Sequence, residues 1–537
     1  MSARSGGRIL VDQLVRQGVT TVFGVPGESY LAVLDALFDV QDKIRFIVGR
    51  QEGGSAYSAE AYGKLTGRPG ICLVTRGPGA TNASIGVHAA SQNSSPMILF
   101  AGQVPRGDRG RDSFQEIDYR SMFGHLAKWV DEIDDPGRIP ELVARAFQVA
   151  ISGRPGPVVL ALPEDMLTQA VDVADAERVR APLLQPAEAD MERLRNLVAA
   201  AERPLVIAGG STWTAEASER FRVFAEAGGL PVATGFRRQD LFDNSSPSYA
   251  GALGLSTNPY LQDALREADL VIVAGGRPDA ITTGEFSLLQ APRPTQGLVH
   301  VSPGIEDLGR VYRADLLINA TAAEFAAAWI RTPGAHRESW RARTASLHAE
   351  YERCLVPNPS RAGLDYPSIV AHLSRTMPPD TVVTLGAGRY TGACQRHYRF
   401  TRLGTQLAGQ VGAMGYGLPA AIAAKTVHPD REVVAFAGDG CFLMTGQELA
   451  TAMQFDLPLI VIVVNDASYG AIRAHQDREY PGRTLGTDLV NPDFAAFARA
   501  FGAHGEVVER TDQFPGALER SRAAGRPAII ELRLATE

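Results

Sequence analysis

Short apolar runs that end at glycine-rich turns recur along the chain, and most are followed by a segment with apolar residues at helical spacing. Such runs predict strands, and the spaced segments predict helices. In the first part of the chain the predicted strands are 22–25, 44–48, 70–75, 96–101 and 158–162, and the predicted helices are 8–17, 30–38, 55–66 and one ending at 90. This alternation predicts a parallel sheet with helices on its faces.

The same pattern restarts twice. Further strands are predicted at 204–208, 231–233, 270–274 and 298–301, and then at 382–385, 433–437 and 459–464. Polar, proline-containing segments at 167–190 and 336–363 separate the three parts and predict linkers. We therefore expect an α/β protein with three doubly wound parallel-sheet domains. Their predicted ranges are 1–170, 190–335 and 360–537.

Two acidic residues follow neighbouring strands of the third domain. The strand 433–437 runs into Gly438-Asp439-Gly440, a helical segment is predicted over 441–455, and the next strand ends in Asn465-Asp466. A strand–helix–strand unit of this length places both carboxylates at one edge of the sheet. N–H groups of glycine turns and helix starts attract phosphate oxygens. Carboxylates repel phosphate unless a divalent cation such as Mg²⁺ lies between them. The pattern predicts a diphosphate–Mg²⁺ site, with a glycine turn beside two solvated acids as the alternative.

This stretch resembles the thiamine diphosphate motif, in which Gly-Asp-Gly, a spacer and Asn-Asn follow one another; here Asp466 stands in the second Asn position. By this resemblance Mg²⁺ is held by Asp439, Asp466 and the carbonyl of Ser468. The cofactor is thiamine diphosphate. The residues implied to bind it are Gly27, Glu52, Asn82, Ala387, Gly388, Gly412, Met414, Gly438, Asp439, Gly440, Cys441, Asp466, Ser468, Tyr469, Gly470 and Ala471.

Glu52 stands between a predicted strand and a predicted helix, among Gly49, Gly53 and Gly54. If Glu52 binds no ligand, it is an ordinary acid at the start of a helix, where the helix dipole favours a negative charge. The resemblance implies a catalytic role, in which the carboxyl group hydrogen-bonds N1′ of the aminopyrimidine and favours the tautomer that deprotonates the thiazolium. It also implies that Met414 wedges between the two rings of the cofactor. In the family this Glu reaches a cofactor held by the other subunit, so we expect a homodimer or a dimer of dimers (a homotetramer).

Three segments bring the chain nearest to the acetolactate synthase large-chain group: Phe114-Gln115-Glu116, Gly412–Gly417 and Gln447-Glu448-Leu449. The resemblance implies that Gln115 hydrogen-bonds substrate oxygens and that Phe114 walls the pocket. It implies a transferase or lyase that cleaves a 2-keto acid and ligates the fragment to a carbonyl acceptor. The alternatives are a simple 2-keto acid decarboxylase, an acyl-CoA lyase that uses the same cofactor, and a catalytically silent paralogue that only binds it.

Four positions depart from the acetolactate synthase pattern around the substrate. The usual Arg, Trp, Met and Lys are replaced by Ile281, His475, Ala471 and Glu164. Losing a bidentate cation and an aromatic wall weakens the prediction of a keto-acid acceptor, although Arg473 or His475 can supply replacement polarity.

The central domain binds FAD, ADP or no ligand in different members of the family. FAD-containing acetolactate synthases have Arg-Phe-Asp-Asp-Arg where this chain has residues 277–281, Arg-Pro-Asp-Ala-Ile. They tend to end the later strand in Asp, where this chain has Ser302-Pro303. Both differences argue against FAD, which stays open as an alternative.

The composition excludes several partners. The net charge is −7 and no basic block is present, so we expect no nucleic-acid partner. The longest apolar run, near 457–464, is far shorter than the ~20 residues that span a bilayer. The N-terminal segment lacks a signal peptide's apolar core, and the four cysteines have no metal-like spacing and suggest a reducing compartment. We therefore expect a cytoplasmic protein.

Overall fold

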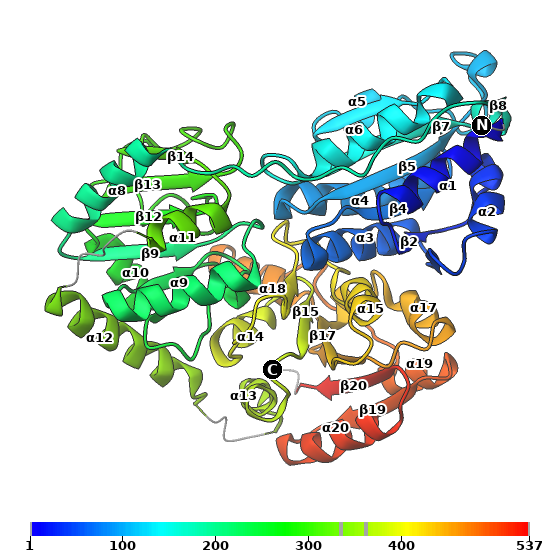
Figure 1. Cartoon of the computed structure of the whole chain (residues 1–537). Helices are drawn as coiled ribbons and strands as arrows, with labels where there is room; N and C mark the ends of the chain where they lie inside the picture. Colours follow the sequence, from blue (N-terminus) through cyan, green and yellow to red (C-terminus); the bar gives the residue numbers. More distant parts are fainter. Residues whose placement is uncertain (1–2, 332–336, 359–362, 535–537) are drawn as a thin grey trace.

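Three six-stranded sheets, each with all its strands parallel, organise the chain (Figure 1). The computed structural model describes residues 3–331, 337–358 and 363–534. The predicted α/β class with three parallel sheets is confirmed. The remaining residues, which include both ends of the chain and parts of the second predicted linker, lie outside the described ranges.

The first sheet has the order β3-β2-β4-β5-β7-β6. Its strands are β2 (Thr21–Gly24), β3 (Arg45–Val48), β4 (Gly70–Val74), β5 (Met97–Gln103), β6 (Trp129–Glu132) and β7 (Pro157–Pro163). The helices are α1 (Gly6–Arg16), α2 (Leu31–Phe38), α3 (Glu52–Thr66), α4 (Gly77–Asn93), α5 (Tyr119–Phe123), α6 (Ile139–Ile151) and α7 (Glu164–Thr168). A short antiparallel pair, β1 (Arg4–Ser5) with β8 (Ala170–Val171), joins the two ends of this domain.

The central sheet has the order β11-β10-β9-β12-β13-β14. Its strands are β9 (Pro204–Ala208), β10 (Val232–Thr234), β11 (Tyr249–Ala252), β12 (Leu270–Ala274), β13 (Gly297–Ser302) and β14 (Leu316–Asn319). The helices are α8 (Glu188–Ala200), α9 (Ala215–Gly228), α10 (Pro259–Glu267), α11 (Ala322–Ile330) and α12 (Glu338–Leu355).

The third sheet has the order β16-β15-β17-β18-β20-β19. Its strands are β15 (Val382–Leu385), β16 (Gln406–Ala408), β17 (Val433–Gly438), β18 (Ile460–Asn465), β19 (His504–Val508) and β20 (Ala528–Arg533). The helices are α13 (Tyr366–Thr376), α14 (Thr391–His397), α15 (Gly417–Val427), α16 (Asp439–Phe442), α17 (Leu449–Gln454), α18 (Gly470–Glu479), α19 (Phe494–Ala500) and α20 (Phe514–Ala523).

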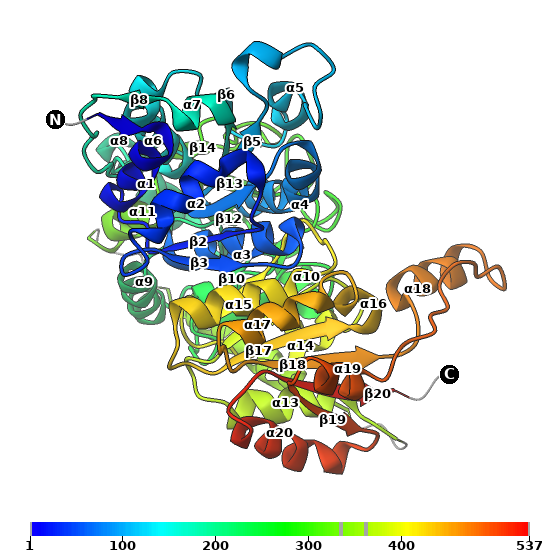
Figure 2. The ribbon, with the colours of Figure 1, turned by 90° about the vertical axis from the view of Figure 1, so that its right-hand side faces the viewer.

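The first and third domains share one hydrophobic core, although the whole central domain separates them in the chain. Helix α3 packs on α4 and on α15, as Figures 1 and 2 show. Small residues on these helices allow the close approach: a Cβ on Gly86 of α4 would lie 2.4 Å from the Cβ of Ala56 on α3. The central domain instead has its own cores. The N-terminal end of α3 is therefore fixed relative to the third domain.

The helical segment predicted over 441–455 is interrupted. It forms α16, a 3-10 turn at Gly446–Glu448, and then α17. Thr445 marks the break, where its hydroxyl donates to the carbonyl of Gly415 at 2.7 Å. The break turns Glu448 away from the line of a continuous helix and toward the first domain.

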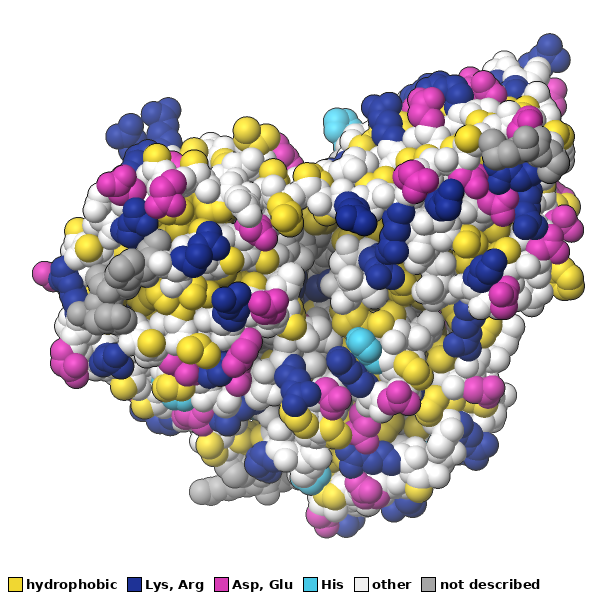
Figure 3. Space-filling model, in the orientation of Figure 1, with side chains coloured by type: hydrophobic (Ala, Val, Ile, Leu, Met, Phe, Trp, Pro, Cys, Tyr) yellow, Lys and Arg dark blue, Asp and Glu magenta, His cyan; other side chains and the backbone are white. Residues whose placement is uncertain are grey.

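Charged side chains of both signs are interspersed on the face shown in Figure 3. No helix among the described residues combines the length and apolar character needed to cross a bilayer.

Candidate functional site

Glu52 is the first residue of α3 and its side chain is half-buried. The side chain of Gln51 caps the helix by accepting the N–H of Gly54 at 3.0 Å. Asn82, on α4, donates from its amide nitrogen to Glu52 Oε2 at 2.9 Å. The structure thus brings together two predicted cofactor residues that lie 30 positions apart. The first-turn position of Glu52 favours a negative charge.

The glycine turns beside Glu52 leave no room for side chains. A Cβ on Gly27 would lie 2.5 Å from the Cβ of Thr75. Gly77, the first residue of α4, donates its N–H to the carbonyl of Gln115 at 3.0 Å. The loop 114–115 is therefore docked on the start of the helix that carries Asn82. Gln115 adopts a positive φ of 67°, and Phe114 is 73% exposed.

Asp439 begins α16, directly after β17, and is only 2% exposed. It accepts the N–H of Gly440 at 2.8 Å and the side-chain amide of Asn491 at 2.6 Å. Burial raises the pKa of the Asp439 carboxyl, and the negative charge of Asp466 raises it further. The two predicted metal ligands are thus close enough to interact electrostatically.

Asn465 ends β18, next to β17 in the sheet. Its amide nitrogen donates to Glu531 at 2.8 Å, and its oxygen accepts from Asn491 at 2.9 Å. Asp466 then accepts the N–H of Ser468 at 3.2 Å. Glu531 is a buried acid in the apolar strand β20; this lone acid was the only signal in the sequence for its supporting role. Asn491 comes from a distant loop, and no sequence pattern pointed to it.

Oxygen donors predominate in this cluster. The amide oxygen of Asn491 is buried, and within the described residues it has no hydrogen-bond partner. No three His, Cys, Asp or Glu side chains of the described ranges are grouped as a metal site. Two carboxylates with neutral oxygens fit Mg²⁺, which takes one or two carboxylates and completes its shell with water and phosphate oxygens.

The predicted glycine turns of the third domain surround Cys441. A Cβ on Gly386 would lie 2.4 Å from its sulfur, and the sulfur accepts the N–H of Gly415 at 3.2 Å. The Cys441 side chain is therefore directed into the protein, so only its backbone can serve a ligand. Met414 is 37% exposed, and its carbonyl accepts from the hydroxyl of Tyr57 on α3 at 3.3 Å.

The other residues predicted to bind the cofactor lie after β15 and at the start of α18. Gly388 has a positive φ of 154° after β15, while Ala387 and Gly388 are half-buried. Tyr469 donates its N–H to the carbonyl of Thr487 at 2.9 Å, and Gly470 and Ala471 begin α18.

The substitutions around the expected substrate position form their own contacts. Glu164 pairs with the buried Arg76, which stands directly before α4. Arg473 is bound to Asp488 and Thr487. His475 lies on the exposed surface of α18 and its Nδ1 accepts from Arg478 at 2.7 Å. Arg473, one of the two candidates for replacement polarity, is therefore already paired.

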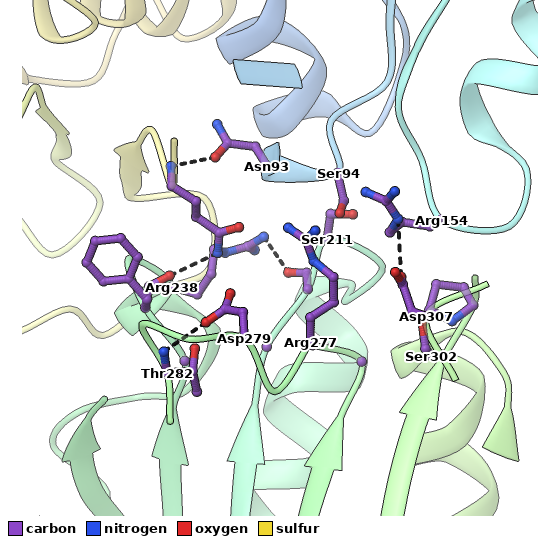
Figure 4. Close-up of a pocket in the computed structure, with 18 residues that line it drawn as sticks. Asn93, Ser94, Arg154, Ser211, Arg238, Arg277, Asp279, Thr282, Ser302 and Asp307 are labelled. Carbon is purple, nitrogen blue, oxygen red and sulfur yellow. Dashed lines mark hydrogen bonds and ion pairs between the residues drawn. The ribbon is translucent and has the colours of Figure 1, made fainter. Parts of the chain in front are cut away.

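The central domain has a crevice at the carboxyl ends of β9, β12 and β13 (Figure 4). Arg154, Arg238 and Arg277 extend into it. Arg154 pairs with Asp307 at 3.1 Å, and Arg238 donates to the carbonyl of Gly210. The cavity measures about 30 Å³, whereas cofactor-sized ligands need roughly 300–1,000 Å³. Arginine side chains of the chain itself extend into this crevice.

Family models match three separate parts of the chain. Residues 4–122 match the family model "Thiamine pyrophosphate enzyme, N-terminal TPP binding domain", 191–329 match its central domain, and 386–532 match its C-terminal TPP binding domain. The chain is 33% identical to the acetolactate synthase large subunit of Parasynechococcus marenigrum over 99% of its length and 87% of the relative. It is 30% identical to the acetolactate synthase isozyme 2 large subunit of Escherichia coli over 99% of its length and 95% of the relative. The large subunit from Corynebacterium glutamicum is 31% identical over 98% of this chain and 86% of the relative.

Proposed function

Because the chain belongs to the thiamine pyrophosphate enzyme family, we propose that it is a thiamine diphosphate- and Mg²⁺-dependent enzyme that cleaves a 2-keto acid and ligates the fragment to a carbonyl acceptor. The observation that carries this proposal is Glu52, the half-buried first residue of α3, whose carboxylate accepts a hydrogen bond from Asn82. A silent paralogue has no need for an oriented acid at this position.

Thiamine diphosphate, when bound, would supply a thiazolium ring whose carbon adds to the keto group and whose positive charge takes up the electron pair released on loss of CO₂. Glu52 would hydrogen-bond N1′ of the aminopyrimidine and exchange a proton there. Asn82 keeps one carboxylate oxygen engaged, which leaves the other free for the cofactor. Positioned proton donors and acceptors of this kind typically contribute 10²–10⁴-fold.

Asp439, Asp466 and the carbonyl of Ser468 would hold Mg²⁺ and, through it, the diphosphate. Asn491 and Glu531 would act behind them: Asn491 binds both Asp439 and Asn465, and Glu531 orients Asn465. Ala387 and Gly388, which are half-buried after β15, would offer N–H groups to the phosphate oxygens. Met414 would support the cofactor rings.

A second copy of the chain would complete this site. Met414 and Phe114 are exposed, and α18 projects from the molecule with no buried residue (Figure 2). Leu485 and Val490, in the segment that follows α18, are also exposed. Because buried apolar area drives association, these surfaces support a homodimer.

Simple decarboxylation is the second candidate. Its support is that Arg473 is already paired with Asp488 and that Ile281 stands where the resemblance expects an arginine, so less positive charge is available to an acceptor carboxylate.

Product analysis tests the proposal. The purified protein, with thiamine diphosphate and Mg²⁺, is given a panel of 2-keto acids with and without a second keto acid or aldehyde. Carboligation predicts a hydroxyketone or a 2-hydroxy-3-keto acid. Aldehyde alone would establish the decarboxylase, and carbon–carbon cleavage of an added 2-hydroxyacyl-CoA to an aldehyde and formyl-CoA would establish the lyase. Cofactor binding without turnover of any substrate would contradict an enzymatic role.

A further inference from the structure

Glu448 is a buried acid of the third domain that lies against the loop before Glu52. It ends the 3-10 turn between α16 and α17 and is 2% exposed. Its Oε1 accepts the N–H of Arg50 at 3.1 Å and of Gln51 at 3.0 Å. Its Oε2 accepts the N–H of Arg50 at 3.2 Å and the hydroxyl of Thr451 at 2.7 Å. Burial raises the pKa of this carboxyl, and the N–H and hydroxyl donors oppose that shift.

The carboxylate occupies a space that only glycine leaves open. A Cβ on Gly54 would lie 2.7 Å from Glu448 Oε1 and 2.9 Å from Cδ. Gly54 is also the residue whose N–H is capped by Gln51. Glu448 therefore fixes the two residues directly before Glu52, and Gln51 in turn fixes the first turn of α3.

The rest of α3 is held by other contacts. Ser58 donates to the carbonyl of Pro419 at 2.9 Å, and Glu60 accepts from the hydroxyl of Tyr416 at 2.6 Å. These bonds attach the helix body to the third domain without Glu448. Because the helix body has its own anchors, loss of the Glu448 bonds would loosen mainly the loop and the first turn, where Glu52 lies.

We propose that Glu448 is a positioning residue for Glu52: by binding the N–H groups of Arg50 and Gln51 across the domain boundary, it sets where the Glu52 carboxylate stands. This inference rests on the proposed function, since it assumes that Glu52 acts on the aminopyrimidine. A displacement of about 1 Å can cost about 10²-fold in rate, so the loop bonds bear directly on catalysis.

Two variants of Glu448 remove its hydrogen bonds to the loop to different extents. Glu448→Met keeps the chain length and removes every acceptor, whereas Glu448→Gln keeps one acceptor oxygen for the loop. In ligand-free protein, amide hydrogen exchange of Arg50 and Gln51 should be fastest in the Met variant and intermediate in the Gln variant. With thiamine diphosphate and Mg²⁺ bound, exchange of the cofactor's C2 hydrogen should slow about 10²-fold in the Glu448→Met variant and about tenfold in the Glu448→Gln variant. The KM for the keto acid should change less than kcat.

Asp269 provides a matched control in the central domain. Its carboxylate likewise accepts two successive backbone N–H groups, those of Glu202 at 2.7 Å and Arg203 at 2.8 Å. Asp269→Leu should accelerate amide exchange at those two residues and leave C2 exchange unchanged. This separates an effect on Glu52 from a general loss of stability.

C2 exchange within twofold of the wild type in a folded Glu448→Met protein would overturn the inference while leaving the proposed function intact. If the Met variant does not fold, the Gln variant decides, and a C2 rate within twofold of the wild type again refutes the positioning role. An equal loss in Asp269→Leu would also refute it. A wild-type protein that binds the cofactor but turns over no keto acid would instead refute the proposed function, and the amide exchange of ligand-free protein would still report whether Glu448 holds the loop.

Discussion

Replacing Glu52 with Gln separates a catalytic role from that of an ordinary helix-start acid. The Gln side chain keeps an oxygen that can accept from Asn82, as Glu52 Oε2 does at 2.9 Å. The cap supplied by Gln51 is independent of residue 52. The substitution thus removes the exchangeable proton and the negative charge with little other disturbance.

Two magnitudes follow from these contacts. Loss of a first-turn negative charge costs about 0.3–1 kcal/mol of stability. Loss of a positioned acid–base group costs about 10²–10⁴-fold in the proton-transfer step, or roughly 3–5 kcal/mol. We therefore expect C2 exchange of bound thiamine diphosphate to slow by that factor, with cofactor affinity falling less.

Proton NMR after acid quench measures the C2 exchange rate directly. Glu338→Gln is the matched control, because Glu338 is the first residue of α12 in another part of the chain. It should reproduce the small stability change and leave C2 exchange unaltered. An exchange rate within error of the wild type in Glu52→Gln would leave Glu52 without a catalytic role.

Three other predictions concern the cofactor, the assembly and stability. Asp439→Ala should lose thiamine diphosphate affinity in calorimetry with Mg²⁺ present, because it removes a predicted metal ligand; unchanged binding would remove Asp439 from the site. Light scattering should give at least a homodimer, and a monomer that turns over substrate would contradict a shared site. Burial lowers the pKa of Lys64 from 10.5 to about 8, so the native protein binds fewer protons than the unfolded chain between those values and its free energy of unfolding should rise with pH there. Lys64→Met should lack this rise in chemical unfolding series, and a parallel pH dependence in both proteins would show that the ammonium is not buried.

Several features of the site could be predicted from local sequence. Gly438-Asp439-Gly440 and Asn465-Asp466 each follow an apolar run, and the parallel pairing of β17 with β18 places them at one sheet edge. Likewise, Glu52 was predicted to stand between a strand and a helix, and it is the first residue of α3, which begins three positions earlier than predicted. Such patterns are informative because a short apolar run, a glycine turn and a helix start are each determined by residues close in the chain.

What the sequence by itself determined, then, is the three α/β units and the strand ends that carry the acids. It did not predict the edge strands β6, β11, β14, β16 and β19 or the inner strand β20. The edge strands β6 and β14 are partly exposed, so they lack the continuous apolar runs of central strands, and the apolar run of β20 is interrupted by Glu531. Only the tertiary structure decided that α3 packs on α15, that Asn491 reaches Asp439, and that Glu448 holds the loop before Glu52. These contacts join residues tens to hundreds of positions apart, and they depend on how whole domains pack, which no local pattern of residues specifies.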